Sequence, residues 1–515
     1  MCQVKVPRSG LLTLLLSLLS LCAHAQDEET VQVIRGGCTP DVNVESTDGA
    51  ITRGLRRKLP TFKKKWDANK TYRQLVMLVE FSDTVFSKDR EYYDRLFNEP
   101  GFNGESRARG SVADYFRDQS NGLFNPQFDV YGPIRVNRAA RVGSETDHGK
   151  GVFHDAAQKL VDSLAIDLSP YDWDGNHTVD QVVIVYAGLS GNVSGNEGFL
   201  WPNTGYFAEV NAGKYSLSSF SASSERITEK SFTGIGTICH EYSHCFGLPD
   251  IYPTNTNINV FSIVDEWDLM DGGNFCCRGW CPPSYTTLEK MLLGWYTPIE
   301  LTEPTTIEGM KPVTEGGDAY IIYHTDKEYL LLENRQLSGW DSYVPGTGLL
   351  IFHVDYNESD WRNNVVNNMR LQPRFSIVCA DNMSYEAWEA KVPTSDRYEG
   401  RKSRSIYMST APYPYVTDST RNDALTETTT PSYKMHNMGA LGYYSLRKPI
   451  TNIRVSDDGL VSFDFMKEGQ TPVGRLVAPQ GKDKSGYYSL QGQRIENRKL
   501  SKGVYIHDGK KVIIK

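Results

Sequence analysis

The residues best suited to do chemistry in this chain lie between positions 240 and 250, which read HEYSHCFGLPD in one-letter code. His240 and His244 are four residues apart, so on a helix their imidazoles share one face and can hold a single metal ion. Glu241 lies beside them, where a carboxylate can take a proton from a water that the metal activates. This pattern predicts a zinc ion that serves the hydrolysis of peptide bonds.

The residues after the second histidine supply a third ligand. Gly247 can end the helix, because glycine tolerates positive φ. The chain can then turn back and offer the carboxylate of Asp250. Three protein ligands leave one position of a tetrahedral zinc open, which distinguishes a catalytic site from a structural one. Ile235, Ile238 and Phe246 give this segment an apolar side, so we expect a buried helix.

Length and composition narrow the class of protein. A chain of 515 residues suggests about two to four modules. It is 39% hydrophobic and 23% charged, as is ordinary for a globular protein. Its net charge of −8 comes without a basic stripe in the main body, which argues against nucleic-acid binding. Beyond the first residues, we find no segment long and apolar enough to span a membrane.

The first 25 residues are typical of a secretory signal peptide. Lys5 and Arg8 precede a short apolar run, and Ala23-His24-Ala25 fits a cleavage site. We therefore expect the protein to be secreted or held at the cell surface. Cys22 raises the alternative of a lipoprotein, although the residue before it, Leu21, is larger than such a signal prefers.

Residues 26–70 are polar and carry basic clusters, which suits a removable pro-segment or a solvated leader. Residues 35–41, with Cys38 at their centre, resemble the cysteine-switch segment of matrix metalloproteases. That family has arginine directly before the cysteine, and here the arginine is Arg35. A thiolate from Cys38 would occupy the open zinc position and keep the site latent.

A short segment before a predicted strand alternates oxygen-bearing residues in the manner of calcium loops. These residues are Asp172, Asp174, Asn176, Thr178 through its carbonyl, and Asp180. The segment is not an EF-hand, because Val183 stands where a bidentate glutamate is needed. We expect calcium here, since carboxylates so close together repel one another without a cation. The alternative is an Asp/Asn-rich turn that caps the strand.

The remaining pattern predicts an α+β fold. Residues 71–300 would form the zinc protease domain, with a twisted mixed sheet, an active-site helix at 235–246 and Met270 in a glycine-rich turn. In metzincin proteases a methionine in such a turn lies beneath the metal, although methionine is more often core packing. Residues 301–466 would form an antiparallel β-module. Residues 467–515 would form a small β tail, with Asp508-Gly509 as a hairpin turn.

Other residues that could act as ligands or form disulfides lie outside the zinc motif. Glu333, His353 and Asp355 could bind a metal, but residues of this kind are more often satisfied structural groups. Cys276, Cys277 and Cys281 are close enough in sequence for a disulfide in an oxidising compartment. Cys239 and Cys245 are expected to be free thiols.

From about residue 75 to 466 the chain resembles the M6 peptidases, which include the immune-inhibitor-A metalloproteases of bacilli, and it looks closest to secreted Bacteroidota members. The motifs that carry this resemblance are SVADYF, YDWDGN, HEYSHCFGLPD, WDLMDGG, ENRQLSGWD and GLLIFHVD. The resemblance implies a zinc endopeptidase with His240, His244 and Asp250 as ligands and Glu241 as general base. It also implies a two-part domain around a cleft whose floor is the 235–246 helix. Bound calcium is common in exported proteases of this kind.

The resemblance extends more weakly to the C-terminal tail. Two alternative interpretations compete with the zinc endopeptidase described above. The tail is similar to those of Bacteroidota proteins exported by type IX secretion, which implies secretion machinery as a partner beside protein or peptide substrates. One rival keeps His240 and His244 but takes Glu266 or Glu289 as third ligand, as thermolysin-like enzymes do. The other is a surface adhesin whose protease site has decayed, and it is disfavoured because every catalytic group is retained.

Overall fold

The structure is a computed structural model that describes residues 66–467, except 142–147, 165, 194–195, 197, 255–261, 370 and 384–407, and four short strands between 487 and 514. The predicted signal peptide, Cys38 and the pro-segment up to residue 65 lie outside the described residues. The chain divides into two compact units, residues 1–467 and 468–515. Among the described helices, none combines the length and the apolar character that crossing a bilayer requires.

The first part of the larger unit is built on a mixed sheet with strand order β2-β1-β3-β5-β4, and β6 pairs with β5. Its strands are β1 (Thr71–Glu80), β2 (Asn125–Arg135), β3 (Val182–Leu189), β4 (Asn203–Ala212), β5 (Tyr215–Thr228) and β6 (Ser231–Phe232). Neighbours among β2, β1, β3 and β5 are parallel, whereas β4 and β6 run antiparallel to β5. The predicted mixed sheet is therefore confirmed, and β4 is an edge strand.

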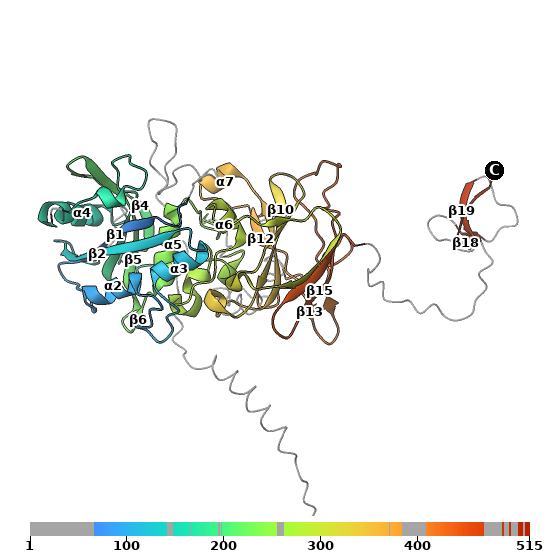
Figure 1. Ribbon diagram of the computed structural model, residues 1–515, viewed down its shortest axis with the longest axis horizontal. Helices are drawn as coiled ribbons and strands as arrows, with labels where there is room; N and C mark the ends of the chain where they lie inside the picture. The colour runs from blue at the N-terminus through green and yellow to red at the C-terminus, as the bar shows by residue number, and fades with distance from the viewer. Residues whose placement is uncertain are drawn as a thin grey trace, which may run out of the picture. The chain divides into compact units, whose positions relative to one another are not determined.

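Both faces of this sheet are covered, which explains the unbroken apolar run of residues 75–79 within β1. Along β1, Val76 and Leu78 enter one core, and Leu75 and Met77 enter the other. Helix α4 (Lys150–Leu164) packs against one face, and α2 (Arg90–Asn98) and α3 (Val112–Gln119) pack against the other (Figure 1).

Helix α5 (Ile235–Cys245) lies in the core shared with α2 and α3 and contacts β4 and β5. It also packs closely on the 3-10 segment η3 (Gly273–Gly279), which follows η2 (Asp265–Trp267). A Cβ at Gly236 would come within 2.0 Å of the Asn274 carbonyl oxygen, so only glycine fits this crossing. The glycine therefore sets how close the motif helix lies to the turn that follows it.

The chain then passes through α6 (Thr287–Leu292), which begins at a capping box of Thr286 and Glu289. The helix ends before Gly294, which takes a φ of +69°. A short 3-10 turn, η1 (Ser169–Tyr171), lies earlier in the chain and precedes the predicted calcium segment.

The second part contains the predicted β-module. Its main sheet has the order β12-β11-β10-β9-β7, and a smaller one has the order β15-β16-β8. The bounds are β7 (Ile299–Glu300), β8 (Thr305–Met310), η4 (Val313–Glu315), β9 (Tyr320–Tyr323), β10 (Glu328–Arg335), η5 (Gly339–Asp341), β11 (Gly348–Asp355), α7 (Glu358–Arg362), β12 (Phe375–Ile377), β13 (Tyr415–Val416), β14 (Arg421–Asn422), β15 (Ile450–Val455) and β16 (Val461–Phe465). Its pairings are antiparallel as predicted, apart from β7 with β9.

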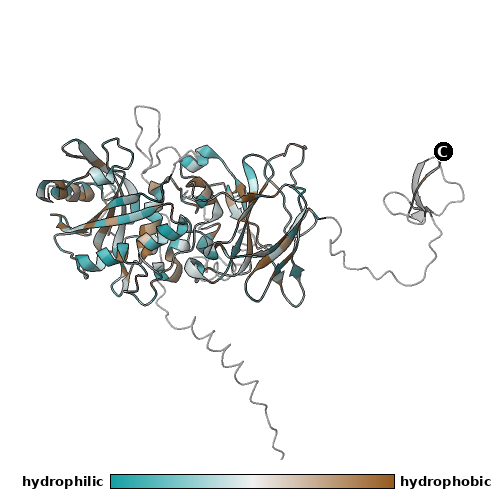
Figure 2. Ribbon diagram, viewed as in Figure 1, coloured by the Kyte–Doolittle hydropathy of each residue, from teal (hydrophilic) through white to brown (hydrophobic). Residues whose placement is uncertain are grey.

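The two parts share one hydrophobic core. The boundary near residue 300 therefore separates two sets of sheets, but the two parts pack together. Trp340, Leu331 and Trp361 of the second part join the core that also holds α5. Figure 2 shows α7 as largely hydrophilic, and its Trp361 is nevertheless fully buried. That tryptophan anchors an otherwise solvated helix.

The smaller unit contains β17 (Tyr487–Tyr488), β18 (Arg494–Ile495), β19 (Gly503–His507) and β20 (Lys510–Ile514). They form one sheet in the order β18-β17-β19-β20. Strands β19 and β20 pair antiparallel on either side of residues 508–509, where the hairpin turn was predicted.

A buried ion-pair network ties β10 to the segment before α6. Arg335 is fully buried and contacts Asp341 through Nε at 2.7 Å and Glu333 through Nη1 at 3.2 Å. The two carboxylates also accept hydrogen bonds from the backbone N–H groups of Ser284 and Thr287. Glu333, considered above as a ligand, therefore lies in a structural network.

We predict that Arg335→Ala lowers the free energy of unfolding by about 3–5 kcal/mol, because it leaves two buried carboxylates without their cation. Arg421→Ala is the matched control. Its guanidinium is 61% exposed and pairs with Asp423, so a loss of no more than about 1 kcal/mol is expected. Chemical denaturation followed by circular dichroism measures both. Equal losses in the two variants would contradict the role assigned to Arg335.

Candidate metal centre and active site

Helix α5 and the turn after it bring the three predicted zinc ligands together. The Nε2 atoms of His240 and His244 lie 3.3 and 3.2 Å from Oδ1 of Asp250. The turn is made at Gly247, which has a φ of +95° and follows the helix end as predicted. The three side chains form a group whose candidate ligand atoms lie within 4.8 Å of one another.

Backbone carbonyls orient both imidazoles. Nδ1 of His240 lies 2.9 Å from the carbonyl oxygen of Leu269, and Nδ1 of His244 lies 2.8 Å from that of Leu248. A carbonyl only accepts hydrogen bonds, so each Nδ1 carries the hydrogen. Each Nε2 is then left with a lone pair directed toward Asp250, as in metal-bound histidines.

The ligand atoms are buried without hydrogen-bond partners among the described residues. This holds for both Nε2 atoms, for Oδ1 of Asp250 and for Oε1 of Glu241. Polar atoms buried in this way are costly unless something satisfies them. Two imidazole nitrogens and a carboxylate oxygen are ligands that zinc accepts, so the residues fit a zinc ion.

The charges of the three side chains and of Glu241 also favour a positive charge among them. Burial lowers the pKa of His240, but the nearby carboxylates of Asp250 and Glu241 outweigh it and raise the pKa to about 9. Burial raises the pKa of Asp250, yet His244 and His240 together hold it well below its usual range. Without a metal, a proton would therefore supply part of the positive charge that the carboxylates attract.

Glu241 is held at one oxygen and free at the other. Thr204 on edge strand β4 donates through Oγ1 to Oε2 of Glu241 at 2.9 Å and to its carbonyl oxygen at 2.8 Å. Oε1 has no hydrogen-bond partner in the described part of the chain. A carboxylate positioned in this way can accept a proton. Sequence reasoning missed Thr204, because nothing in the chain pattern links it to the motif.

The second part of the unit supplies a further residue that sequence reasoning missed. Asn364 donates from Nδ2 to Oδ2 of Asp250 at 2.6 Å, and its Oδ1 accepts from the Asp250 N–H at 2.7 Å. This pair of hydrogen bonds joins residues 114 positions apart. Asn364 has a φ of +57° just after α7. Asparagine tolerates positive φ better than most residues. This tolerance is the only local indication that position 364 has a particular role.

Met270 lies in a turn that contacts the metal group. Its side chain is fully buried, and its carbonyl oxygen accepts a hydrogen bond from Ile251 N at 2.8 Å. Its own N–H donates to Oδ1 of Asp268 at 2.6 Å. The neighbouring Leu269 provides the carbonyl that orients His240. The turn thus supports both a ligand and the segment that carries Asp250.

The glutamates considered as alternative third ligands lie outside the group formed by His240, His244 and Asp250. Oε2 of Glu289 accepts from Thr286 N at 2.7 Å within the helix cap. Its other oxygen faces Asp268. Burial, followed by the charge of Asp271, raises the pKa of Asp268 to about 7, and burial likewise raises that of Glu289. The geometry therefore favours Asp250 over Glu266 or Glu289.

The predicted calcium segment forms a tight turn in which three carboxylates, Asp172, Asp174 and Asp180, come together. Oxygens of the segment also accept local backbone hydrogen bonds. Asp172 Oδ1 accepts from Gly175 N at 2.8 Å, and Asn176 Oδ1 accepts from Thr178 N at 2.7 Å. These bonds agree with the alternative of a capped turn, and calcium binding stays a prediction.

The cysteines of the described residues are free. Cys239 is buried and Cys245 is partly exposed, as expected for free thiols. The expectation of a disulfide among Cys276, Cys277 and Cys281 is wrong, because all three are free thiols. Their backbone follows the sharp turns of η3, where Cys277 has a φ of +50°.

Residues 203–291, which contain β4, α5 and the Met270 turn, match the family model described as immune inhibitor A peptidase M6, catalytic domain. Within these residues the chain is similar to the M6 catalytic domain. The chain is similar to immune inhibitor A of Bacillus thuringiensis subsp. alesti, with 25% identity over 309 residues, covering 49% of this chain and 44% of that protein. It is also similar to the pre-pro-metalloprotease PrtV of Vibrio cholerae serotype O1, with 21% identity over 275 residues, covering 44% of this chain and 30% of that protein. The chain thus spans less than half the length of these relatives.

We predict that Asp250→Ala abolishes zinc binding at the site of His240 and His244, whereas Glu289→Gln retains it, because of these two carboxylates it is Asp250 that lies beside the histidines. Asn364→Ala should weaken zinc binding by about 10–100-fold, since it releases the second oxygen of Asp250. Competition with a chromogenic chelator gives the affinities. Loss of zinc from Glu289→Gln in a folded protein would reinstate the rival ligand set.

The pair formed by Asp268 and Glu289 should also make stability depend on pH. The folded pKa of Asp268, about 7, lies above its ordinary value of 3.8, so the folded protein holds a proton that the unfolded chain releases. Stability from this group is present at low pH and is lost as the pH rises through about 7. We expect Asp268→Asn to raise the thermal midpoint more at pH 8 than at pH 5. An equal shift at both values would contradict the shared proton.

Proposed function

We propose that this protein is a secreted zinc-dependent endopeptidase that hydrolyses peptide bonds of protein substrates, with His240, His244 and Asp250 as zinc ligands and Glu241 as general base. The observation that carries the proposal is the convergence of unpartnered Nε2, Nε2 and Oδ1 atoms beside the free Oε1 of Glu241. The match to the M6 catalytic domain, and two relatives named as immune inhibitor A and a metalloprotease, support it.

The zinc ion, when bound, would polarise the substrate carbonyl and make a water molecule more acidic. Glu241 takes the proton of the attacking water on Oε1 and delivers it to the leaving amine. Thr204 keeps Oε2 engaged, so that the carboxylate does not rotate away. Leu269 and Leu248 keep the histidines in the tautomer that can bind metal.

Strand β4 is suited to hold the substrate. It is the edge of the sheet, and Thr204 places it directly beside the general base. Many proteins bind an extended peptide by adding it as a strand to the edge of a sheet. A peptide that pairs with β4 in this way would pass over Glu241. The substrate is therefore proposed to bind as a strand.

The site is closed in this structure. His240, Glu241 and Asp250 are 0% exposed and His244 is 1% exposed, so a polypeptide can reach them only after covering residues move away. Closure of this kind suits a zymogen. We include in the proposal a removable pro-segment at 26–70, with Cys38 as a latency thiol.

Other parts of the proposal rest on sequence and local geometry. The turn that contains Met270 and orients His240 through the Leu269 carbonyl supports a metzincin-like arrangement. Calcium is proposed at the carboxylate turn of residues 172–180. The signal peptide at 1–25 implies secretion, and the tail at 467–515 implies contact with secretion machinery. The decayed adhesin is disfavoured, because every group proposed to act in catalysis is present in the sequence.

We predict that Glu241→Gln keeps one zinc at this site and the wild-type fold but cleaves casein or a fluorogenic peptide at least about 10²–10⁴-fold more slowly, because the general base is lost. Glu229→Gln, an exposed glutamate, is the matched control and should cleave normally. A chelator should abolish wild-type activity, and zinc should restore it. Substantial proteolysis by Glu241→Gln, or activity insensitive to chelation, would refute the proposal.

A further inference from the structure

A second group of metal-binding side chains lies in the second part of the unit, apart from the catalytic motif. It consists of Glu328 at the start of β10, His353 in the middle of β11, and His436 in the segment that follows β14. One ligand atom from each lies within 4.8 Å of the others. The rings of His353 and His436 are 4.5 Å apart at their centroids, and Nε2 of His353 lies 2.8 Å from Oε1 of Glu328.

The pairing of β10 with β11 brings the first two of these residues together. In the register of this pair, His353 is opposite Leu330, two residues from Glu328, and Glu328 is opposite Asp355. His353 and Glu328 are 6% and 0% exposed. The register of these two central strands therefore places a buried histidine next to a buried carboxylate.

The segment that carries His436 also holds the carboxylate of Glu328. Oε2 of Glu328 accepts hydrogen bonds from Asn437 N at 2.9 Å and from Asn437 Nδ2 at 3.0 Å, and its Oε1 accepts one from His436 N. These bonds fix Glu328 beside both histidines.

The third group, His436, is held as metal-bound histidines are. Its Nδ1 lies 3.2 Å from Oδ2 of Asp355. Asp355 is itself fixed by Arg374 Nη1 at 2.6 Å and by Asn437 Nδ2 at 3.0 Å. A carboxylate at one ring nitrogen sets the tautomer and leaves the other nitrogen for a metal. Nε2 of His436 has no hydrogen bond from the residues that the structure describes.

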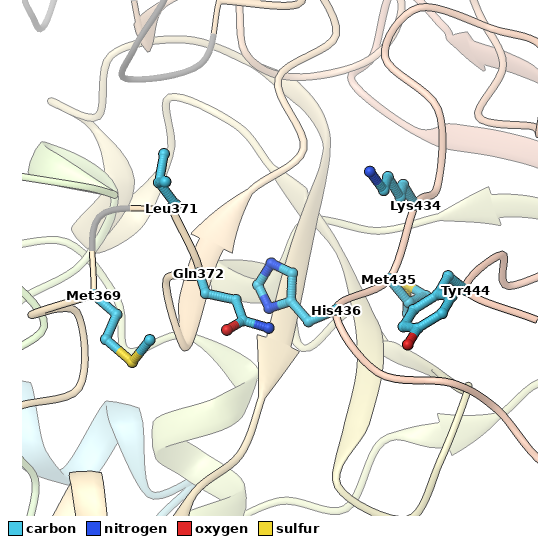
Figure 3. A pocket seen from close by; sticks show the side chains of 7 residues that line it. All are labelled: Met369, Leu371, Gln372, Lys434, Met435, His436 and Tyr444. Atoms are coloured by element: carbon cyan, nitrogen blue, oxygen red, sulfur yellow. The ribbon is translucent and has the colours of Figure 1, made fainter.

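A cation would have a route to this group. His436 lies in the wall of a surface pocket of about 710 Å³, between Gln372 and Met435 (Figure 3). His353 and Glu328, which both contact His436, are buried in the sheet. Tetrahedral zinc separates its ligand atoms by about 3.3 Å. The contact between His353 and Glu328 would therefore open by only about 0.5 Å to admit the ion.

We propose that Glu328, His353 and His436 form a second metal site, suited to zinc or a similar first-row divalent cation, which cross-links β10, β11 and the 434–437 segment. Two imidazoles and one carboxylate match the ligands that such ions select. Asp355 and Asn437 act as positioning residues. The site is independent of the proposed peptidase activity, and its fourth coordination position is open to water or a group from the pocket.

The test uses the full chain with Glu241→Gln in the background, so that proteolysis does not limit the protein. Mass spectrometry of metals after equilibration with buffered zinc should find two zinc ions per chain. His436→Gln and His353→Gln should each reduce the number to one. His154→Gln, a partly exposed histidine beside Asp155, is the control and should keep both ions.

A double variant, His240→Ala with His244→Ala, separates this site from the catalytic one. It should retain one zinc ion, and adding zinc should raise its thermal midpoint. Asp355→Asn in this background should weaken the remaining zinc by about 10–100-fold, because it releases the ring of His436. If the double variant binds no zinc while remaining folded, or if His436→Gln leaves the zinc number at two, the group is a hydrogen-bonded cluster only and the proposal is wrong.

Discussion

The interaction on which this structure depends is the burial of two imidazole lone pairs and a carboxylate oxygen against one another. Among the residues that the structure describes, none offers a hydrogen bond to the atoms that His240, His244 and Asp250 turn toward one another. Such an arrangement is expensive in a dry interior unless a cation lies among them. The surrounding structure holds the arrangement in place. Carbonyl groups lock both rings, Gly247 turns the chain, and Asn364 fixes the far side of the carboxylate.

That dependence explains why the β-rich part belongs to the catalytic unit. Asn364 follows a helix whose only deep anchor is Trp361, and it holds the third ligand from a position far along the chain. The buried Arg335 network ties β10 to the segment before α6. One continuous core includes both parts. A fragment ending near residue 300 would therefore lose a hydrogen-bond partner of Asp250 together with the residues that the second part contributes to the shared core.

The two metal groups face different physical demands. In the first, the ligand atoms are unpartnered, so a cation is needed to compensate their burial. In the second, Glu328 and His353 are hydrogen-bonded to each other, so the sheet can form before any ion arrives. A metal would add a cross-link there rather than rescue buried charge. The first group therefore couples metal binding to the active geometry, and the second would tune the stability of the module that supplies Asn364.

The sequence by itself was enough to predict the catalytic chemistry proposed above, because the residues involved lie close together in the chain. His240 and His244 share a helix face through a four-residue spacing, and Gly247 brings Asp250 back within three residues. Local spacing also indicated the strands and the helix that carry them, since periodicity reports which faces are buried. Only the tertiary structure brought Thr204 to Glu241, Asn364 to Asp250 and Glu328 to His436, because these contacts join residues far apart in the chain. Their positions are set by strand order, register and shared packing, and no local pattern encodes those.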